Sequence, residues 1–255
     1  MNELHVLNGD ALAEQSKSFL DPKQVCVARE ILMEGPVDYQ NISEFWDNRA
    51  AFIHDFIGEE KTVYLDKVLP EFEKISSLSA PHKIYLWFEF DLFCQVNFWF
   101  TLNLIRSINL EHQIYWVRPN TKDWKGFGAY SPERLKDLWQ DAYQLSRREI
   151  QTLNECWNAY QKNDKTKFQE ILERSSLELH FLNDIIEAHF SRLPNSEQLT
   201  RPEKSLIEIS KAIKSKDFAA IFPLFSAKEG IYGYGDLQVE KLWNSILLNH
   251  SELLY

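Results

Sequence analysis

The sequence predicts an α/β protein: a Rossmann-like parallel sheet of about four strands, followed by a mostly helical C-terminal half. Three observations predict this class. Short apolar runs alternate with longer helical patterns in the first half, as they do in βαβ units. The short runs lack apolar–polar alternation, which is typical of strands covered on both faces. Beyond residue 117 the pattern becomes purely helical.

In the first half, helical patterns separate four predicted strands. The strands are the runs rich in β-branched and aromatic residues at 4–7, 24–28, 83–88 and 112–117. Helical spacing of apolar residues separates them at 11–19, 44–57, 63–75 and 92–108.

The second half carries strong helix-start signals. Ser131 is an N-cap residue followed by Pro132 at the first helical position. Capping boxes predict helix starts at Ser146 and Thr200, with Glu149 and Glu203 as their third residues. Further helices are expected after Asp164, after Ser175, over 217–222 and over 236–247.

Composition limits the possible partners and the compartment. The formal net charge of −10 argues against a nucleic-acid partner, because phosphate binding depends on clustered Lys and Arg. The three cysteines lie far apart and form no Cys-x-x-Cys pair, which favours a reducing compartment. The most apolar run, 84–108, is too polar to cross a bilayer. The sequence therefore predicts a cytoplasmic protein without a membrane partner, and its oligomeric state stays open.

Three segments are expected: a Rossmann-like α/β domain over 1–130, a helical region packed on it over 131–193, and a small helical module over 194–255. The polar, Pro-containing stretch 193–198 marks the second boundary. The last module could resemble a winged helix. Its final helix, 236–247, is poor in the Arg and Lys that a DNA recognition helix presents, so a packing role is favoured.

The first strand ends in Asn8-Gly9-Asp10, directly before a helix. Gly9 can adopt backbone geometries that other residues resist, so the chain can turn sharply here. Asn8 and Asp10 then lie at the carboxyl end of the strand. One glycine makes neither a dinucleotide-binding fingerprint nor a P-loop. The alternative is that Asp10 only caps the following helix.

The third strand runs into Glu89-Phe90-Asp91, where two carboxylates lie one residue apart. Buried carboxylates are costly unless they are paired, capping or liganded. Asp91 could have a purely structural role as the N-cap of the following helix. Glu89 lies inside the most apolar stretch of the chain and has no such structural explanation. Gln95, four residues beyond Asp91, is expected to project near it on the first helical turn.

Topology decides whether these two loops meet. If the strand order is 2-1-3-4, the crevice between strands 1 and 3 is the switch point at which open α/β sheets bind ligands. The expected catalytic residues of this site are Glu89 and Asp91. The expected ligand-binding residues are Asn8, Gly9, Asp10 and Gln95. Glu34 or Arg29 after strand 2, and Arg118 after strand 4, are expected at its edges.

Two chemistries suit such a cluster. Asp10, Glu89 and Asp91 could hold a divalent metal such as Mg²⁺ for phosphate-ester chemistry. Alternatively, crowded carboxylates raise one another's pKa, which would leave Glu89 or Asp91 as a general acid or base. The Gly-containing loop 124–130 could close over the pocket or touch a phosphate, or could be a plain connecting turn.

Five motifs stand out along the chain: 8–10, Glu34-Gly35-Pro36, the Trp-Phe-Glu-x-Asp-Leu-Phe-x-Gln run 87–95, 126–128 and Gly233-Tyr234-Gly235-Asp236. Together they resemble a bacterial family known only as domain of unknown function 1835, and the resemblance covers essentially the whole chain. Phe90 stands where members of that family commonly have His. The resemblance implies a fold and a placement of motifs, and no activity.

The expected function is binding of a small phosphate-bearing or nucleotide-like ligand at the carboxyl ends of strands 1 and 3, by a metal-assisted hydrolase or transferase. The alternative is a non-enzymatic regulatory or interaction protein that uses its C-terminal helices as an adaptor. DNA binding through the C-terminal module is a weaker third expectation. The sequence leaves open whether the protein is an enzyme.

Overall fold

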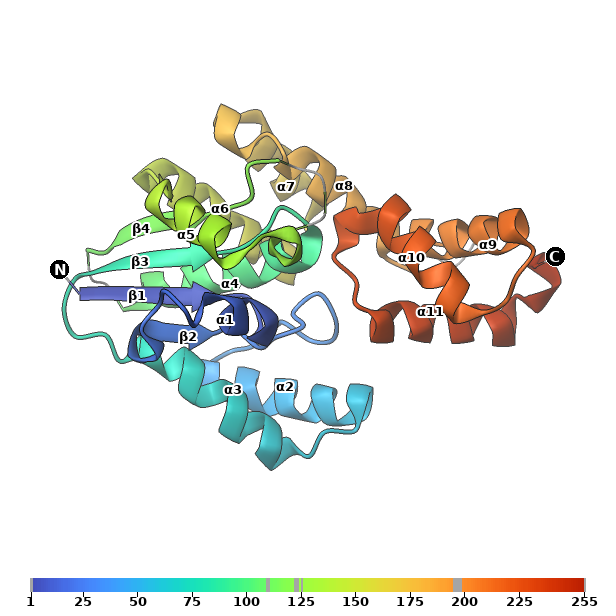
Figure 1. The fold of residues 1–255 in the computed structure, drawn as a ribbon, viewed down its shortest axis with the longest axis horizontal. Coiled ribbons are helices and arrows are strands. Elements are labelled where there is room, and N and C mark those ends of the chain that lie inside the picture. Colours follow the sequence, from blue (N-terminus) through green and yellow to red (C-terminus); the bar gives the residue numbers. More distant parts are fainter. Residues whose placement is uncertain (1, 109–110, 122–123, 125, 195–198, 255) are drawn as a thin grey trace. The chain divides into compact units, whose positions relative to one another are not determined.

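A computed structural model describes residues 2–108, 111–121, 124, 126–194 and 199–254 (Figure 1). The chain divides into two compact units: unit 1 comprises Met1–Glu89 and Cys94–His180, and unit 2 comprises Phe90–Phe93 and Phe181–Tyr255. This division differs from the expected boundaries at 130 and 193, because the helix before residue 193 groups with the C-terminal helices. Residues 195–198 of the predicted boundary stretch, and Lys125 of the predicted loop 124–130, lie outside the described residues.

Unit 1 is built on a five-stranded sheet in the order β2-β1-β3-β4-β5. The first four strands are parallel and β5 is antiparallel to β4, so the sheet is mixed but mostly parallel. The α/β class and the order 2-1-3-4 are therefore confirmed. The strands are β1 (Asn2–Leu7), β2 (Val25–Val27), β3 (His82–Trp87), β4 (Gln113–Val117) and β5 (Tyr143–Gln144).

The fifth strand was not expected. Leu135, Leu138, Trp139, Ala142 and Leu145 follow Ser131 at helical spacing, which predicts a helix that reaches residue 145. The α5 helix (Pro132–Gln140) ends earlier. Tyr143 pairs with Trp116 and Gln144 pairs with Tyr115, so tertiary pairing at the sheet edge overrides the local helical pattern.

Two helix layers cover the sheet (Figure 1). On one face, Leu7, Trp87 and Val117 form a core with residues of α1 (Asp10–Ser16) and α5, including Leu12 and Leu135.

On the other face lies α4 (Leu92–Ser107), where Phe98 stacks on Phe88 with ring centroids 5.2 Å apart. Trp99 and Phe100 of the same helix pack on Tyr160 and Trp157 of α6 (Arg147–Gln161). Because α4 is enclosed between the sheet and other helices, its sequence is apolar on nearly every side.

The helices α2 (Ile42–Ile57) and α3 (Lys61–Ser76) lie beside the β2 edge (Figure 1). Two side chains of α3 occupy the outer hydrogen-bonding groups of β2. The Glu71 carboxylate accepts from the Val27 amide at 2.9 Å, and Lys74 Nζ donates to the Val25 carbonyl at 2.9 Å. An open strand edge invites pairing with another chain, so these contacts protect the sheet.

Most helix starts agree with the sequence signals. Ser131 and Asp164 accept from the expected backbone amides, and Ser146 and Thr200 form full capping boxes. The helix expected after Ser175 forms as α8 (Leu182–Arg192), but it begins later than predicted because a 3₁₀ turn, Leu177–Leu179, precedes it. The remaining helix of unit 1 is α7 (Lys165–Glu173), and other 3₁₀ turns lie at Pro22–Gln24, Phe127–Ala129, Gly230–Tyr232 and Ser251–Leu253.

Unit 2 contains α8 with α9 (Arg201–Ile213), α10 (Phe218–Glu229) and α11 (Asp236–Asn249). Leu206, Ile221, Phe225, Val239 and Trp243 form its core. Over 181–194 and 199–254, the described parts of this unit, the chain forms helices and turns only.

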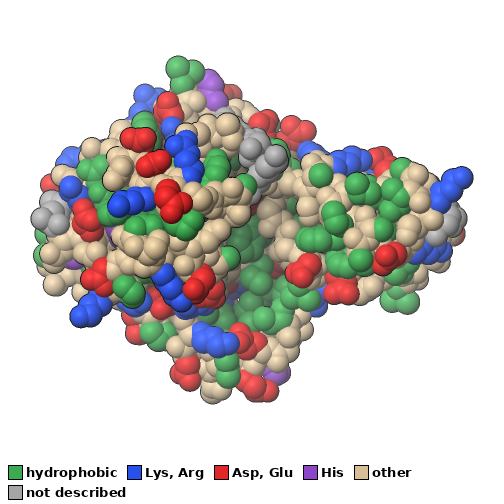
Figure 2. Space-filling model, in the orientation of Figure 1, with side chains coloured by type: hydrophobic (Ala, Val, Ile, Leu, Met, Phe, Trp, Pro, Cys, Tyr) green, Lys and Arg blue, Asp and Glu red, His purple; other side chains and the backbone are tan. Residues whose placement is uncertain are grey.

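Acidic and basic side chains are interspersed on the face of unit 1 shown in Figure 2, with no gathering of Lys and Arg on that face. Among the described residues, no helix has the length and apolar character that crossing a membrane requires.

Candidate functional site

The β1 and β3 strands run side by side and end at the same level, because Leu7 pairs with Trp87 in the parallel register. The residues that follow them therefore meet at one edge of the sheet. The α4 helix begins at Leu92, five residues beyond the end of β3, so its first turn lies next to the same edge. The strand order reverses here, which makes this edge the switch point of the sheet.

A chain of hydrogen bonds crosses this edge. Asn97 Nδ2 donates to Asn8 Oδ1 at 3.0 Å, and Asn8 Nδ2 donates to Cys94 Sγ at 3.0 Å. The Cys94 thiol in turn donates to Glu89 Oε2 at 3.6 Å. Each amide group therefore has a fixed orientation, and the sulfur is held between an amide donor and a carboxylate acceptor.

Glu89 is half-buried, and its carboxylate also binds the loop that follows β4. Its Oε1 accepts from the Phe127 backbone amide, which ties the loop after β4 to the site. Gly126 approaches so closely that a Cβ atom at this position would overlap the Glu89 carboxylate, and its φ of +62° also favours glycine. Glu89 thus has a structural contact that the sequence does not reveal.

Gln95 is fully buried beside Glu89. Its Nε2 donates to the Glu89 carbonyl at 2.6 Å, which fixes the orientation of the side-chain amide because a carbonyl accepts only from the NH₂ group. Its Oε1 is buried and has no hydrogen-bond partner among the described residues. A buried acceptor without a partner costs about 1–3 kcal/mol.

Asn97 is anchored from the far side by the segment after β2. Its Nδ2 also donates to the Glu30 carbonyl at 2.8 Å, and its Oδ1 accepts from the Leu32 amide at 3.4 Å. The Glu30 side chain forms a fully buried ion pair with Arg49 of α2, with 2.8 Å between the closest oxygen and nitrogen. This pair holds the segment that orients Asn97.

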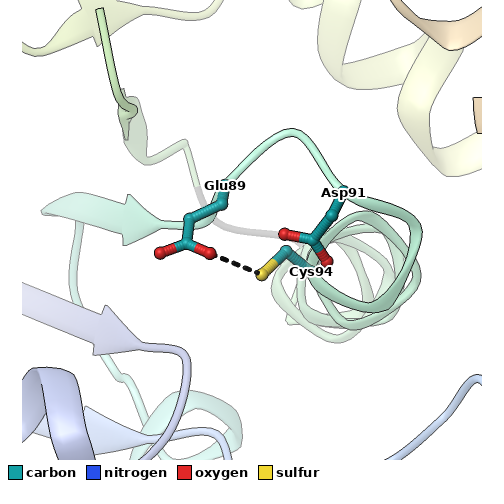
Figure 3. A group of neighbouring side chains, drawn as sticks. All are labelled: Glu89, Asp91 and Cys94. Atoms are coloured by element: carbon teal, nitrogen blue, oxygen red, sulfur yellow. Dashed lines mark hydrogen bonds between the residues drawn. The ribbon is translucent and has the colours of Figure 1, made fainter. Parts of the chain in front are cut away.

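Glu89, Asp91 and Cys94 bring one possible metal-ligand atom each to within 4.8 Å of one another. Figure 3 shows the three side chains at the end of β3 and the start of α4, with the Cys94 sulfur close to both carboxylates. They belong to one stretch of six residues, so the local backbone sets their spacing. Asp91 is 6% exposed, and the Gly233 backbone (φ +65°) packs so closely against its carboxylate that a Cβ there would overlap it.

The chemistry of this donor set favours one group of cations. A thiolate with two carboxylates suits Zn²⁺ and related transition metals, whereas Mg²⁺ prefers oxygen ligands alone. The first turn of α4 contributes the positive end of its dipole, which favours negative charge on the ligands. A Zn²⁺-type ion fits these residues better than the Mg²⁺ expected from the carboxylates.

Asp10 and Arg118, also expected at the site, make other contacts. Asp10 is the exposed first residue of α1, whose N-cap is Gly9, and it forms an ion pair with Arg29 at 2.8 Å. Arg118 pairs with Glu178 at 2.6 Å and lies over the Trp116 ring.

The remaining two candidates contribute through their backbone. Gly9 precedes α1 with a φ of +99°, the turn that the sequence predicts. The Glu34 carbonyl accepts from Arg49 Nη1 at 2.6 Å, so its backbone helps to hold the buried ion pair.

Two residues of the network, Cys94 and Asn97, were not predicted as site residues. Their signal is in the sequence: Cys94, Gln95 and Asn97 are polar or sulfur-bearing positions within an otherwise apolar helix. Buried polar groups of this kind need partners, so their spacing one and three residues apart could have placed them near one another.

Searches found no family model, no curated protein and no solved structure that matches this chain. The fold and the site alone define the class: an α/β protein with a buried polar network at the switch point of a mostly parallel sheet.

Proposed function

We propose that this chain is a Rossmann-like protein that binds a small phosphate-bearing or nucleotide-like ligand at the carboxyl ends of β1 and β3. A divalent cation held by Glu89 and Cys94, with Asp91 from the same loop, links the ligand to the protein. The observation that carries the proposal is the close approach of these three donor groups, within 4.8 Å, at the switch point of the sheet.

Electrostatics connect the cation to the ligand class. The network itself supplies a carboxylate and a thiol. The two arginines that the sequence predicts at the edges of the site are engaged elsewhere, since Arg29 pairs with Asp10 and Arg118 with Glu178. A phosphate alone would be repelled by Glu89, whereas a metal-bound phosphate would be attracted. Metal and ligand are therefore expected to bind together rather than independently.

Two further groups support binding at this edge. The first-turn amides of α4 favour an anionic group, as helix N-termini do. The buried Oε1 of Gln95 is an acceptor that a ligand hydroxyl or amino group can satisfy. The amide groups of Asn8 and Asn97 orient the sulfur and need not touch the ligand.

If the bound ligand reacts, the cation would act as the Lewis acid of a metal-assisted hydrolase or transferase. Asn8 would keep the Cys94 sulfur in place, and the Cys94 thiol would lose its proton to solvent when the metal binds, because metals bind the thiolate and Glu89 itself would bind as a carboxylate. Binding of the cation is then accompanied by release of a proton and weakens as the pH falls.

Thermal unfolding with a panel of nucleotides and divalent cations tests the proposal. Zn²⁺ or Mn²⁺ together with a nucleotide should raise the melting temperature by more than the sum of their separate effects. Glu89→Gln should remove this cooperative shift, and it keeps an acceptor for the Phe127 amide. The matched control is Asp10→Asn, which removes an acid at the end of β1 outside the network and should leave the shift unchanged. No shift with any combination, or equal shifts in wild type and Glu89→Gln, would overturn the proposal.

A further inference from the structure

A cleft lies in unit 1, lined by α2, α3, α4 and the segment before α2, with a volume of about 570 Å³. This volume is typical of a small-molecule pocket. Trp46 and Phe72 are buried lining residues with ring centroids 5.0 Å apart. Leu104 and Ile42 extend the apolar lining, and Ile42 remains 43% exposed. The cleft therefore offers aromatic and aliphatic surface to a ligand.

The hydroxyl groups around the cleft are largely engaged. Ser107 Oγ donates to the Leu104 carbonyl at 2.6 Å, and Ser76 Oγ donates to the Phe72 carbonyl at 3.5 Å. At one end Tyr39 accepts from Asn103 at 3.4 Å, and burial raises the pKa of Tyr39. The tyrosine is therefore neutral at physiological pH and presents a polar, uncharged group.

The lining includes a single ionised side chain, the exposed Glu73 of α3, and no Lys or Arg. Within the described part of the chain, Glu73 has no ion-pair partner. A carboxylate at the rim of an apolar cleft attracts an ammonium group. An anionic ligand would be repelled.

The geometry points to a binding site for a small aromatic amine, with its ring against Trp46 and Phe72 and its ammonium group near Glu73. This ligand class is opposite in charge to the one proposed for the sheet edge. Neither site shares a residue with the other, so each can be disabled alone.

Three probes of similar size and different charge test the inference: phenethylamine, 2-phenylethanol and 3-phenylpropionate, each measured by saturation-transfer NMR and calorimetry on the full chain. Phenethylamine should bind at least tenfold more tightly than 3-phenylpropionate, with the alcohol between them. Glu73→Gln should reduce that ratio to less than threefold without abolishing binding of the alcohol. The control Asp47→Asn, an exposed acid of α2 outside the lining, should leave the ratio unchanged.

Ser43→Trp provides an independent test, since Ser43 is an exposed lining residue and the larger ring would fill the cleft without entering the core. It should abolish binding of all three probes while the melting temperature stays within a few degrees. Equal affinity for amine and carboxylate, or binding that survives Ser43→Trp, would overturn the inference. Failure of nucleotide and metal binding at the sheet edge would have no bearing on it.

Discussion

The buried ion pair between Arg49 and Glu30 is expected to be the most sensitive polar contact of unit 1. Neither side chain has any exposed surface. Arg49 also donates to the carbonyl oxygens of Ile31, Glu34 and Pro36, at 3.1, 2.6 and 3.3 Å. The informative substitution is Arg49→Met, which keeps an unbranched apolar side chain and removes every one of these donors.

The cost follows from what the substitution leaves behind. The Glu30 carboxylate would remain buried, with hydrogen bonds from the Ile31 amide and the Tyr64 hydroxyl and no opposite charge. Breaking a buried pair in this way costs about 3–5 kcal/mol. Total stabilities are about 5–15 kcal/mol, so Arg49→Met should remove a large fraction of the free energy of unfolding. The double variant Glu30→Gln/Arg49→Met removes the orphaned charge and should recover roughly 2 kcal/mol or more of that loss.

Urea unfolding followed by tryptophan fluorescence measures the effect, because seven of the eight Trp residues belong to unit 1. The matched control is Arg29→Met, since Arg29 pairs with an Asp10 side chain that is 70% exposed. That loss should cost less than about 1 kcal/mol. Equal costs for the two arginine variants would refute the reasoning, as would a double variant no more stable than Arg49→Met.

Three further predictions concern other parts of unit 1. Burial lowers the pKa of His5 from 6.5 to about 4, and Trp87 Nε1 donates to its Nδ1. As the pH falls, His5 is protonated near pH 6.5 in the unfolded chain but only near pH 4 in the folded protein. The free energy of unfolding should therefore fall by up to about 3 kcal/mol as the pH drops from 6.5 through 4. His5→Gln should remove this pH dependence from a series of urea unfolding curves. Gly126→Ala should lower the melting temperature, with a cost of roughly 1–3 kcal/mol of stability, because its φ of +62° and ψ of −164° lie in a region adopted essentially by glycine alone and its Cβ would overlap the Glu89 carboxylate. Gly128→Ala should be neutral because its Cβ would meet no atom within 4 Å. Glu71→Ala should expose the β2 edge and increase light scattering on prolonged incubation, whereas Glu14→Ala, which breaks an exposed pair, should not.

The sequence predicts the sheet well because each strand is a short, continuously apolar run bounded by turn signals. The sequence does not fix the strand order, but the order 2-1-3-4 on which the switch-point hypothesis depends is the one that the sheet has. β5 could not be predicted, since Tyr143 and Gln144 pair with β4 only through tertiary contact and carry a helical pattern locally. The grouping of Phe90–Phe93 with the C-terminal helices also could not be predicted from the sequence, because it depends on contacts between residues far apart in the chain.

The candidate site was predicted in part. Asn8, Glu89 and Gln95 do meet at the ends of β1 and β3, as the topology requires. Asp10 instead forms an ion pair with Arg29. Its carboxylate is exposed, so pairing with the guanidinium does not require the carboxylate to be buried away from water. The part played by Arg49 could not be foreseen, because it acts through the Glu30 segment, and only the fold brings these residues together. The resemblance to the uncharacterised bacterial family stays a prediction.

Cobalt(II) titration tests most directly whether the edge of the sheet holds a transition metal. One equivalent of Co²⁺ should produce a sulfur-to-cobalt charge-transfer band in the near ultraviolet, since Cys94 Sγ lies within 4.8 Å of both carboxylate ligand atoms. Cys94→Ser should abolish the band, and Glu89→Gln should weaken Co²⁺ binding at least tenfold. Absence of the band in the wild-type protein, or a band of full intensity in Cys94→Ser, would contradict the proposed site.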